Sequence, residues 1–144
     1  MRLTTFSDYT LRVLMFLAIN PDRLVTVPEI AAAYGISENH LVKVVHQLSR
    51  AGTVEAVRGK GGGLRLAYDP KDIRLGQIVR ASEGTAPIVE CLSDDPTSCR
   101  IAPACRLAAI LVRGFEALFA TLDEYTLADL VRAPRKLEAL LAGD

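Results

Sequence analysis

The stretch from Thr26 to Gly52 constrains the fold of this chain more than any other part of it. It contains two short helical patterns, and the turn between them holds Gly35. Thr26, followed three residues later by Glu29, has the pattern of a capping box, and Ser37 stands where the cap of the second helix belongs. Two capped helices joined by a tight turn with glycine predict a helix-turn-helix.

A β-hairpin is predicted directly after these two helices. The glycine-rich sequence RGKGGG is flanked by pairs of apolar residues, Val54 and Val57 before it and Leu64 and Leu66 after it. Short apolar runs around such a turn are typical of hairpin strands. The sequence is not a phosphate-binding loop, because it lacks the Walker spacing and the Lys-Ser/Thr that follows it. With a further helix over 6–19, for which Ser7 is the expected cap, the order of elements is that of a winged helix-turn-helix.

This order predicts which residues contact DNA. In a helix-turn-helix the recognition helix lies in the major groove, and its N-terminal side chains reach base edges. In this chain those residues are Ser37, Glu38, Asn39, His40 and Lys43. Arg58 and Lys60 of the hairpin are expected to contact phosphates or a minor groove. The formal net charge is zero, so a local basic patch must supply the attraction. The alternative is a helical bundle with a polar surface.

The C-terminal half is predicted to be helical. Short helices are expected at 75–83 and after Pro134, a capped turn at Thr126, and a long helix over 106–124. The long helix has more apolar surface than so small a module can cover, which favours a homodimer; a role in the core of one subunit is the alternative. A twofold dimer would place two recognition helices on one DNA duplex.

We therefore predict a mainly α fold, a winged helix-turn-helix with a long C-terminal dimerisation helix. The predicted divisions are a DNA-binding domain at 1–83, a cysteine-containing, cluster-binding loop at 84–105, and the dimerisation helix and tail at 106–144. No apolar run approaches the roughly 20 residues that cross a bilayer, and Asp8 and Arg12 interrupt the apolar start. A cytoplasmic protein is expected. The sequence contains no catalytic constellation, so an enzyme is not expected.

The three cysteines of the chain, Cys91, Cys99 and Cys105, all lie within the segment CLSDDPTSCRIAPAC. Their spacing is C-x7-C-x5-C, whereas zinc sites usually show paired short spacings. Three thiolates suit an iron–sulfur cluster; a redox-sensing thiol and structural cysteines are the alternatives. A cluster would need a fourth ligand, and the sequence offers no fourth cysteine. Water, a small thiol, a histidine or a carboxylate would have to serve.

Several stretches of the chain carry a family likeness. They include MRLTTFSDYTLRVLMFLA, NHLVKVVHQLSRAG, VRGKGGG, CRIAPACRL and YTLADLV. With these stretches the chain resembles the NsrR/IscR type of winged-helix iron–sulfur transcriptional repressors, from residue 1 to about residue 131. It looks closest to the nitric-oxide-sensitive NsrR branch, because Leu107 stands where IscR-type relatives carry a histidine.

The resemblance implies a homodimeric repressor that binds operator DNA and is released when nitric oxide nitrosylates its cluster. By position, Cys91, Cys99 and Cys105 match the cluster cysteines, and Asp8 matches the residue that in some members supplies the fourth ligand from the partner subunit. Three cysteines and an oxygen favour a [4Fe-4S] cluster, with [2Fe-2S] possible. The seven-residue interval between Cys91 and Cys99 is longer than is usual in the family. A cluster-free regulator that responds to thiol chemistry or a small molecule is the alternative.

Overall fold

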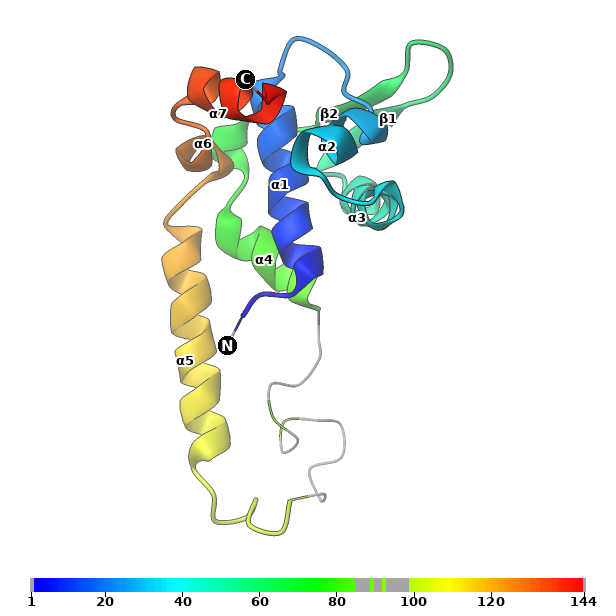
Figure 1. Ribbon diagram of the computed structural model, residues 1–144. Coiled ribbons are helices and arrows are strands. Elements are labelled where there is room, and N and C mark those ends of the chain that lie inside the picture. Colours follow the sequence, from blue (N-terminus) through cyan, green and yellow to red (C-terminus); the bar gives the residue numbers. More distant parts are fainter. Residues whose placement is uncertain (1, 85–88, 90–91, 93–98, 144) are drawn as a thin grey trace.

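The structure, a computed structural model, describes residues 2–84, 89, 92 and 99–143. It consists of a helical head with a small two-stranded sheet, from which one long helix extends away (Figure 1). The elements are α1 (Thr5–Ile19), α2 (Val27–Tyr34), α3 (Glu38–Arg50), β1 (Val54–Val57), β2 (Gly63–Leu66), a short 3-10 turn (Pro70–Asp72), α4 (Leu75–Glu83), α5 (Leu107–Asp123), α6 (Leu127–Leu130) and α7 (Pro134–Ala142). The predicted mainly α, winged-helix fold is confirmed. The loop at 84–105 lies largely outside the described residues, so the three-part division stays a prediction.

The helix-turn-helix forms as its local sequence predicts. The Thr26 hydroxyl accepts a hydrogen bond from the backbone N–H of Glu29, and the Glu29 carboxylate accepts from the backbone N–H of Thr26, which completes the capping box. Gly35 ends α2 in the left-handed region at φ 63°, a conformation that glycine adopts without a steric penalty. Ser37 occupies the cap position of α3, but its side chain makes no capping hydrogen bond.

The cap of α1 differs from the prediction. Thr4, not Ser7, is the cap, and its hydroxyl accepts a hydrogen bond from the Ser7 backbone N–H at 3.1 Å. Ser7 lies inside the first turn and is completely buried. The Ser82 hydroxyl of α4 donates to the Ser7 hydroxyl at 2.8 Å, so the Ser7 side chain serves helix packing rather than capping.

The core of the head surrounds α1. Val13, Leu14 and Leu17 of α1 are at most 2% exposed. They belong to one apolar cluster with residues of α2, α3, the sheet and α6, including Ile30, Leu41, Val44, Val54, Leu64 and Leu127. Burial of each such side chain stabilises the fold by about 1.5–3 kcal/mol. The cluster therefore fixes α3 on the head with one face left in solvent.

The hairpin is hydrogen-bonded to the head at its base, and its tip is a tight turn. Its strands pair antiparallel, from Val54 opposite Leu66 to Val57 opposite Gly63, and Leu64 also exchanges two backbone hydrogen bonds with Val25 at 3.0 and 2.7 Å. At the tip a Cβ on Gly62 would collide with the carbonyl oxygen of Val57. The turn therefore depends on glycine.

The C-terminal half of α5 packs against α4, where Arg80 pairs with Glu116 and lies over the Phe119 ring, and the segment after α5 is hydrogen-bonded to the head. The Leu75 N–H donates to the Tyr125 carbonyl at 3.1 Å, and the Leu127 N–H donates to the Ile73 carbonyl at 2.9 Å. Gly76 of α4 makes room there, because a Cβ at this position would collide with the Asp123 side chain. Figure 1 shows the rest of α5 extending away from the head.

None of the described helices has both the length and the apolar character that crossing a membrane requires.

Candidate DNA-binding surface and cysteine segment

The exposed face of α3 carries the predicted base-contacting residues. All five of them, Ser37, Glu38, Asn39, His40 and Lys43, are exposed. The opposite face of the helix is buried against the core through Leu41, Val44, Val45 and Leu48. Helix packing thus presents the predicted residues to solvent.

The residues directly opposite the buried face form a line that the sequence predictions cover only in part. Asn39, Lys43, His46 and Arg50 are spaced by four, three and four positions, so they share one side of the helix, and all four are exposed. His40 lies outside this line and approaches the Tyr9 ring, with 6.1 Å between ring centroids. The main sequence prediction took the residues nearest the start of α3. The spacing of the helix places His46 and Arg50 on the same exposed side as Asn39 and Lys43.

An open groove borders this line of residues. It has a volume of about 570 Å³ and is lined by Phe6 of α1 and by Lys43, His46, Gln47, Arg50 and Ala51. Lys43 and Arg50 place two cations on its wall, and the His46 imidazole lies between them along the helix. A concave, cationic surface of this kind suits a phosphate backbone.

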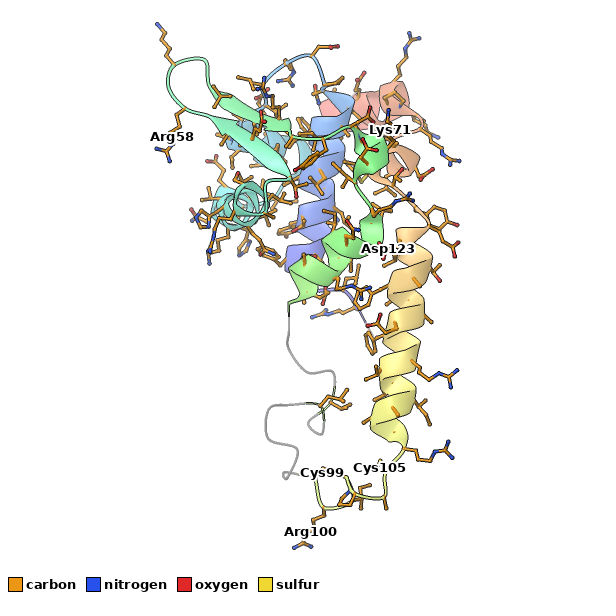
Figure 2. All side chains as sticks on the ribbon, turned by 180° about the vertical axis from the view of Figure 1, so that it is seen from behind. Arg58, Lys71, Cys99, Arg100, Cys105 and Asp123 are labelled. Carbon is orange, nitrogen blue, oxygen red and sulfur yellow. The ribbon has the colours of Figure 1, made fainter. Side chains whose placement is uncertain are left out.

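The hairpin supplies a second group of cations on the same side of the head. Figure 1 shows the hairpin and α3 on one side of α1, and in Figure 2 the Arg58 side chain points away from the body of the protein. Arg58 and Lys60 are exposed. Within the described residues no ion pair involves Lys43, Arg50, Arg58 or Lys60. Their charges are therefore available to an external anion.

The two described cysteines lie at the other end of the molecule. Cys99 and Cys105 are both free thiols and partly buried, and Figure 2 shows them near the end of α5 that is distant from the head. The Cys105 sulfur accepts a hydrogen bond from the Leu107 backbone N–H at 3.4 Å, and hydrogen bonds to sulfur are a feature of iron–sulfur sites. Two free, accessible thiols are soft donors that fit a cluster.

The complete ligand set is not gathered in the described part of one chain. Cys91 lies outside the described residues, and across 2–84, 89, 92 and 99–143 no three His, Cys, Asp or Glu side chains come together at a potential metal site. The start of α1, which carries Asp8, belongs to the head, whereas Cys99 and Cys105 lie far along the direction of α5 (Figure 2). The metal-ligand assignments therefore stay predictions.

Asp8 has a partner that the sequence predictions did not include. Its carboxylate accepts a hydrogen bond from Arg12 Nε at 3.2 Å, and Arg12 Nη2 lies 3.0 Å from its second oxygen. The Arg12 guanidinium also lies over the Tyr34 ring, 5.6 Å from its centroid. The sequence could have predicted this ion pair, because opposite charges four residues apart pair on a helix. The Asp8 side chain remains 48% exposed, so it is open to a further interaction.

Comparisons with known proteins agree with this arrangement. The family Rrf2, described as iron-dependent transcriptional regulators, matches residues 3–133. The chain is 46% identical to the HTH-type transcriptional regulator NsrR of Bacillus subtilis (strain 168) over 142 residues, which are 98% of this chain and 97% of that protein. Its fold is similar to the structure of CymR (YrzC), the global cysteine regulator of B. subtilis, with a TM-score of 0.71, 30% identity and coverage of 92% and 97% of the two chains. It is also similar to T. potens IscR, with a TM-score of 0.70, 28% identity and coverage of 92% and 87%.

The family match covers both the helix-turn-helix and the cysteine segment, which are the two parts that the sequence singled out. The chain belongs to the Rrf2 family of transcriptional regulators.

Proposed function

We propose that this regulator is a nitric-oxide-responsive repressor, that it binds operator DNA as a homodimer in the cytoplasm, and that it holds an iron–sulfur cluster. The observation that carries the DNA-binding part is the placement of exposed cations on α3 and on the hairpin, on one side of the head. The free thiols of Cys99 and Cys105 support the cluster, as does the 46% identity to a regulator named NsrR.

The proposed DNA contacts follow from the chemistry of the exposed side chains. Asn39 can form a bidentate pair with adenine, Lys43 can donate to guanine, and Glu38 can accept from cytosine. Arg50, Arg58 and Lys60 carry the charge that suits phosphates. Base reading by the first half of α3 and backbone contacts by the hairpin and the end of α3 would together position the head on the duplex.

The proposed cluster ligands are Cys91, Cys99 and Cys105, with Asp8 of the partner subunit as the fourth. A bound cluster would supply iron atoms that react with nitric oxide. The distance along α5 between the head and the described cysteines supports a ligand from the other subunit rather than from the same one. Arg12 would hold the Asp8 carboxylate in place before it meets the metal site.

A second copy of this chain is the proposed partner for α5. Leu107, Ile110, Gly114, Ala117 and Thr121 are all exposed, and their spacing of three and four residues is that of a coiled-coil seam. Leu107 and Ile110 are 51% and 61% exposed. The small residues Gly114 and Ala117 would let two helices approach closely. An isologous pair of α5 helices would cover this stripe.

The hairpin gives the first testable prediction. Arg58→Ala or Lys60→Ala should weaken operator binding, and should reduce the slope of log affinity against log salt by about 0.9 for each phosphate that the variant no longer neutralises. Fluorescence anisotropy over a range of salt concentrations measures both quantities. Lys71→Ala is the control, because Lys71 is also an exposed cation but lies away from the hairpin (Figure 2). If the slope is unchanged in both hairpin variants, the hairpin does not contact the DNA phosphates.

Asp8 gives the second prediction. Asp8→Ala should leave a cluster bound by the cysteines but change the nitric oxide concentration that releases DNA, because the weakest ligand would be lost. Iron content and titration of DNA binding with nitric oxide measure the two effects. Arg12→Ala is the comparison variant: it removes the ion pair with Asp8 but keeps the carboxylate, so its effect on nitric oxide sensitivity should be smaller than that of Asp8→Ala. Equal sensitivity of wild type and Asp8→Ala would limit Asp8 to its ion pair and its place in the first turn of α1.

The experiment that tests the whole proposal is an absorption spectrum of anaerobically purified protein, recorded before and after nitric oxide, together with operator binding. We expect a coloured protein with iron and sulfide whose DNA affinity falls when nitric oxide is added. A colourless protein that binds operator DNA equally well with and without nitric oxide would overturn the cluster.

That second outcome would favour a thiol-responsive regulator without a cluster. The fold similarity to CymR, described as the global cysteine regulator, supports this candidate. So does a structure described as the oxidized form of Staphylococcus aureus CymR, which is 27% identical to this chain with a TM-score of 0.68. Operator binding that changes with thiol oxidation in metal-free protein would identify it.

A further inference from the structure

We propose that the last turn of α4, residues 81–83, is the link that couples the state of the cysteine segment to the recognition helix. In this link Ser82 and Glu83 are positioning residues: their side chains hold the last turn of α4 to the start of α1, and the Ala81 carbonyl of the same turn bonds α3. The inference rests on the proposed function, because it concerns how a change at the cluster reaches the DNA-binding surface.

The first observation is a polar cluster that joins the end of α4 to the start of α1. The Glu83 carboxylate accepts hydrogen bonds from the Thr4 backbone N–H at 2.8 Å and from the Thr4 hydroxyl at 3.0 Å. The Ser82 hydroxyl donates to the Ser7 hydroxyl at 2.8 Å, which in turn lies 3.1 Å from the Thr4 hydroxyl. We call Thr4, Ser7, Ser82 and Glu83 the clasp. Its bonds connect residues 75 and 79 positions apart in the sequence.

The electrostatics of the clasp favour a charged Glu83. Partial burial acts to raise the pKa of Glu83, but hydrogen bonds from Ser7 and Thr4 outweigh it and lower the pKa below the usual value. A carboxylate at the N-terminal end of α1 also interacts favourably with the helix dipole. The clasp is therefore fully formed at neutral pH.

The second observation is a hydrogen bond from the same turn to α3. Gln47 Nε2 donates to the Ala81 carbonyl at 3.0 Å. Gln47 also lines the cationic groove beside Lys43 and Arg50. A shift of the last turn of α4 would thus act directly on the helix that presents the DNA contacts.

The space around this bond allows such a shift. A small cavity of about 30 Å³ lies beside it, lined by Gln47, Leu48, Ile78, Ala81, Ser82 and neighbouring residues. Close-packed interiors resist small displacements, and a void at this contact gives the turn room to move. The two helices are therefore joined by a specific polar bond across an incompletely filled contact.

The position of the clasp in the sequence explains why it would respond to the cluster. Glu83 stands eight positions before Cys91, and Thr4 stands four positions before Asp8. The clasp joins the two chain segments that lead to the proposed ligands of this subunit. If loss of a ligand bond moved either segment, the clasp would be the first contact to shift. The hydrogen bond between Ala81 and Gln47 would then pass the movement to the recognition helix.

The double variant Ser82→Ala/Glu83→Ala tests the link. The measured quantity is the ratio of operator Kd without cluster to operator Kd with cluster. For the wild type we expect a ratio of about 100, a coupling of ordinary size for an allosteric protein. In the double variant the ratio should fall at least about tenfold, while iron and sulfide per subunit stay at the wild-type level. Gln77→Ala, at an exposed position of the same helix, should keep the wild-type ratio.

Hydrogen exchange in the metal-free protein gives a readout that does not depend on the cluster. The Thr4 amide should exchange faster in the double variant, because its acceptor is gone. If the double variant does not fold, Glu83→Gln and Ser82→Ala serve singly, and Glu83→Gln should keep part of the ratio because its side chain still offers an acceptor oxygen.

The outcomes separate the inference from the proposed function. A wild-type ratio near 1 would overturn both. A wild-type ratio near 100 that the double variant keeps would overturn the clasp alone and leave the proposed function in place.

Discussion

Cys105→Ala protein purified without oxygen is expected to contain only background iron and sulfide. The three proposed thiolate ligands lie in one short segment, and two thiolates with a carboxylate hold an iron–sulfur cluster poorly because iron in such clusters prefers sulfur. Operator affinity should then fall about a hundredfold, equivalent to about 2.7 kcal/mol, and should no longer respond to nitric oxide. Iron and sulfide assays with anisotropy measurements of DNA binding report both effects.

Two comparisons show whether the loss comes from ligation. Cys105→Ser should behave like the alanine variant, because a hydroxyl keeps the shape of the side chain but is not a soft ligand. Ala104→Ser alters the neighbouring, exposed position and should keep full iron and sulfide. If Cys105→Ala retained iron, sulfide and its response to nitric oxide, the Cys105 thiol would have only a packing role.

Ile110→Glu is expected to convert the proposed dimer to a monomer. Ile110 is 61% exposed in the single chain. In a symmetric pair of α5 helices, the Ile110 side chains of both subunits would be buried. Each buried isoleucine contributes about 1.5–3 kcal/mol, and a carboxylate placed there without a partner would add a larger penalty. Because a monomer contacts only one half-site, operator affinity should fall by more than about a hundredfold. Sedimentation velocity and anisotropy measure the two effects.

Ala109→Glu is the matched control for this variant. It introduces the same charged side chain at the neighbouring exposed position, which lies outside the stripe from Leu107 to Thr121. Ala109→Glu should remain a dimer with nearly unchanged operator affinity. A stable dimer of Ile110→Glu would place the subunit interface elsewhere.

Local patterns in the sequence predicted the elements that depend on neighbouring residues. The Thr26 and Glu29 capping box, the glycine end of α2 and the glycine-dependent hairpin tip are confirmed, since each is determined within a few residues. The prediction that Ser7 caps α1 was wrong, because Thr4 and Ser7 are both residues that suit a cap position. Only the packing of Ser7 against Ser82, which are 75 residues apart, decides between them.

The candidate site was predictable to a similar extent. The sequence identified the exposed start of α3 and the basic hairpin tip, and it ranked His46 as a weaker candidate because His46 lies later on the helix. The helical period, which places His46 and Arg50 on one line with Asn39 and Lys43, was not used. The bonds of Glu83 to Thr4 and of Gln47 to Ala81 could not be predicted from local patterns. The long interval from Cys91 to Cys99 stays unexplained, since most of it lies outside the described residues.

The glycine contact between α4 and α5 has a consequence for operator recognition. Helix α5 has 17 residues, so at 1.5 Å per residue it forms an arm of about 25 Å. It meets the head where Gly76 faces Asp123, and Arg80 steadies it by lying 4.2 Å over the Phe119 ring. If α5 tilts by about 10° about this contact with α4, its far end moves by about 4 Å. In the proposed dimer, side chains near Gly76 would therefore set the spacing between the two recognition helices through the angle of α5 alone.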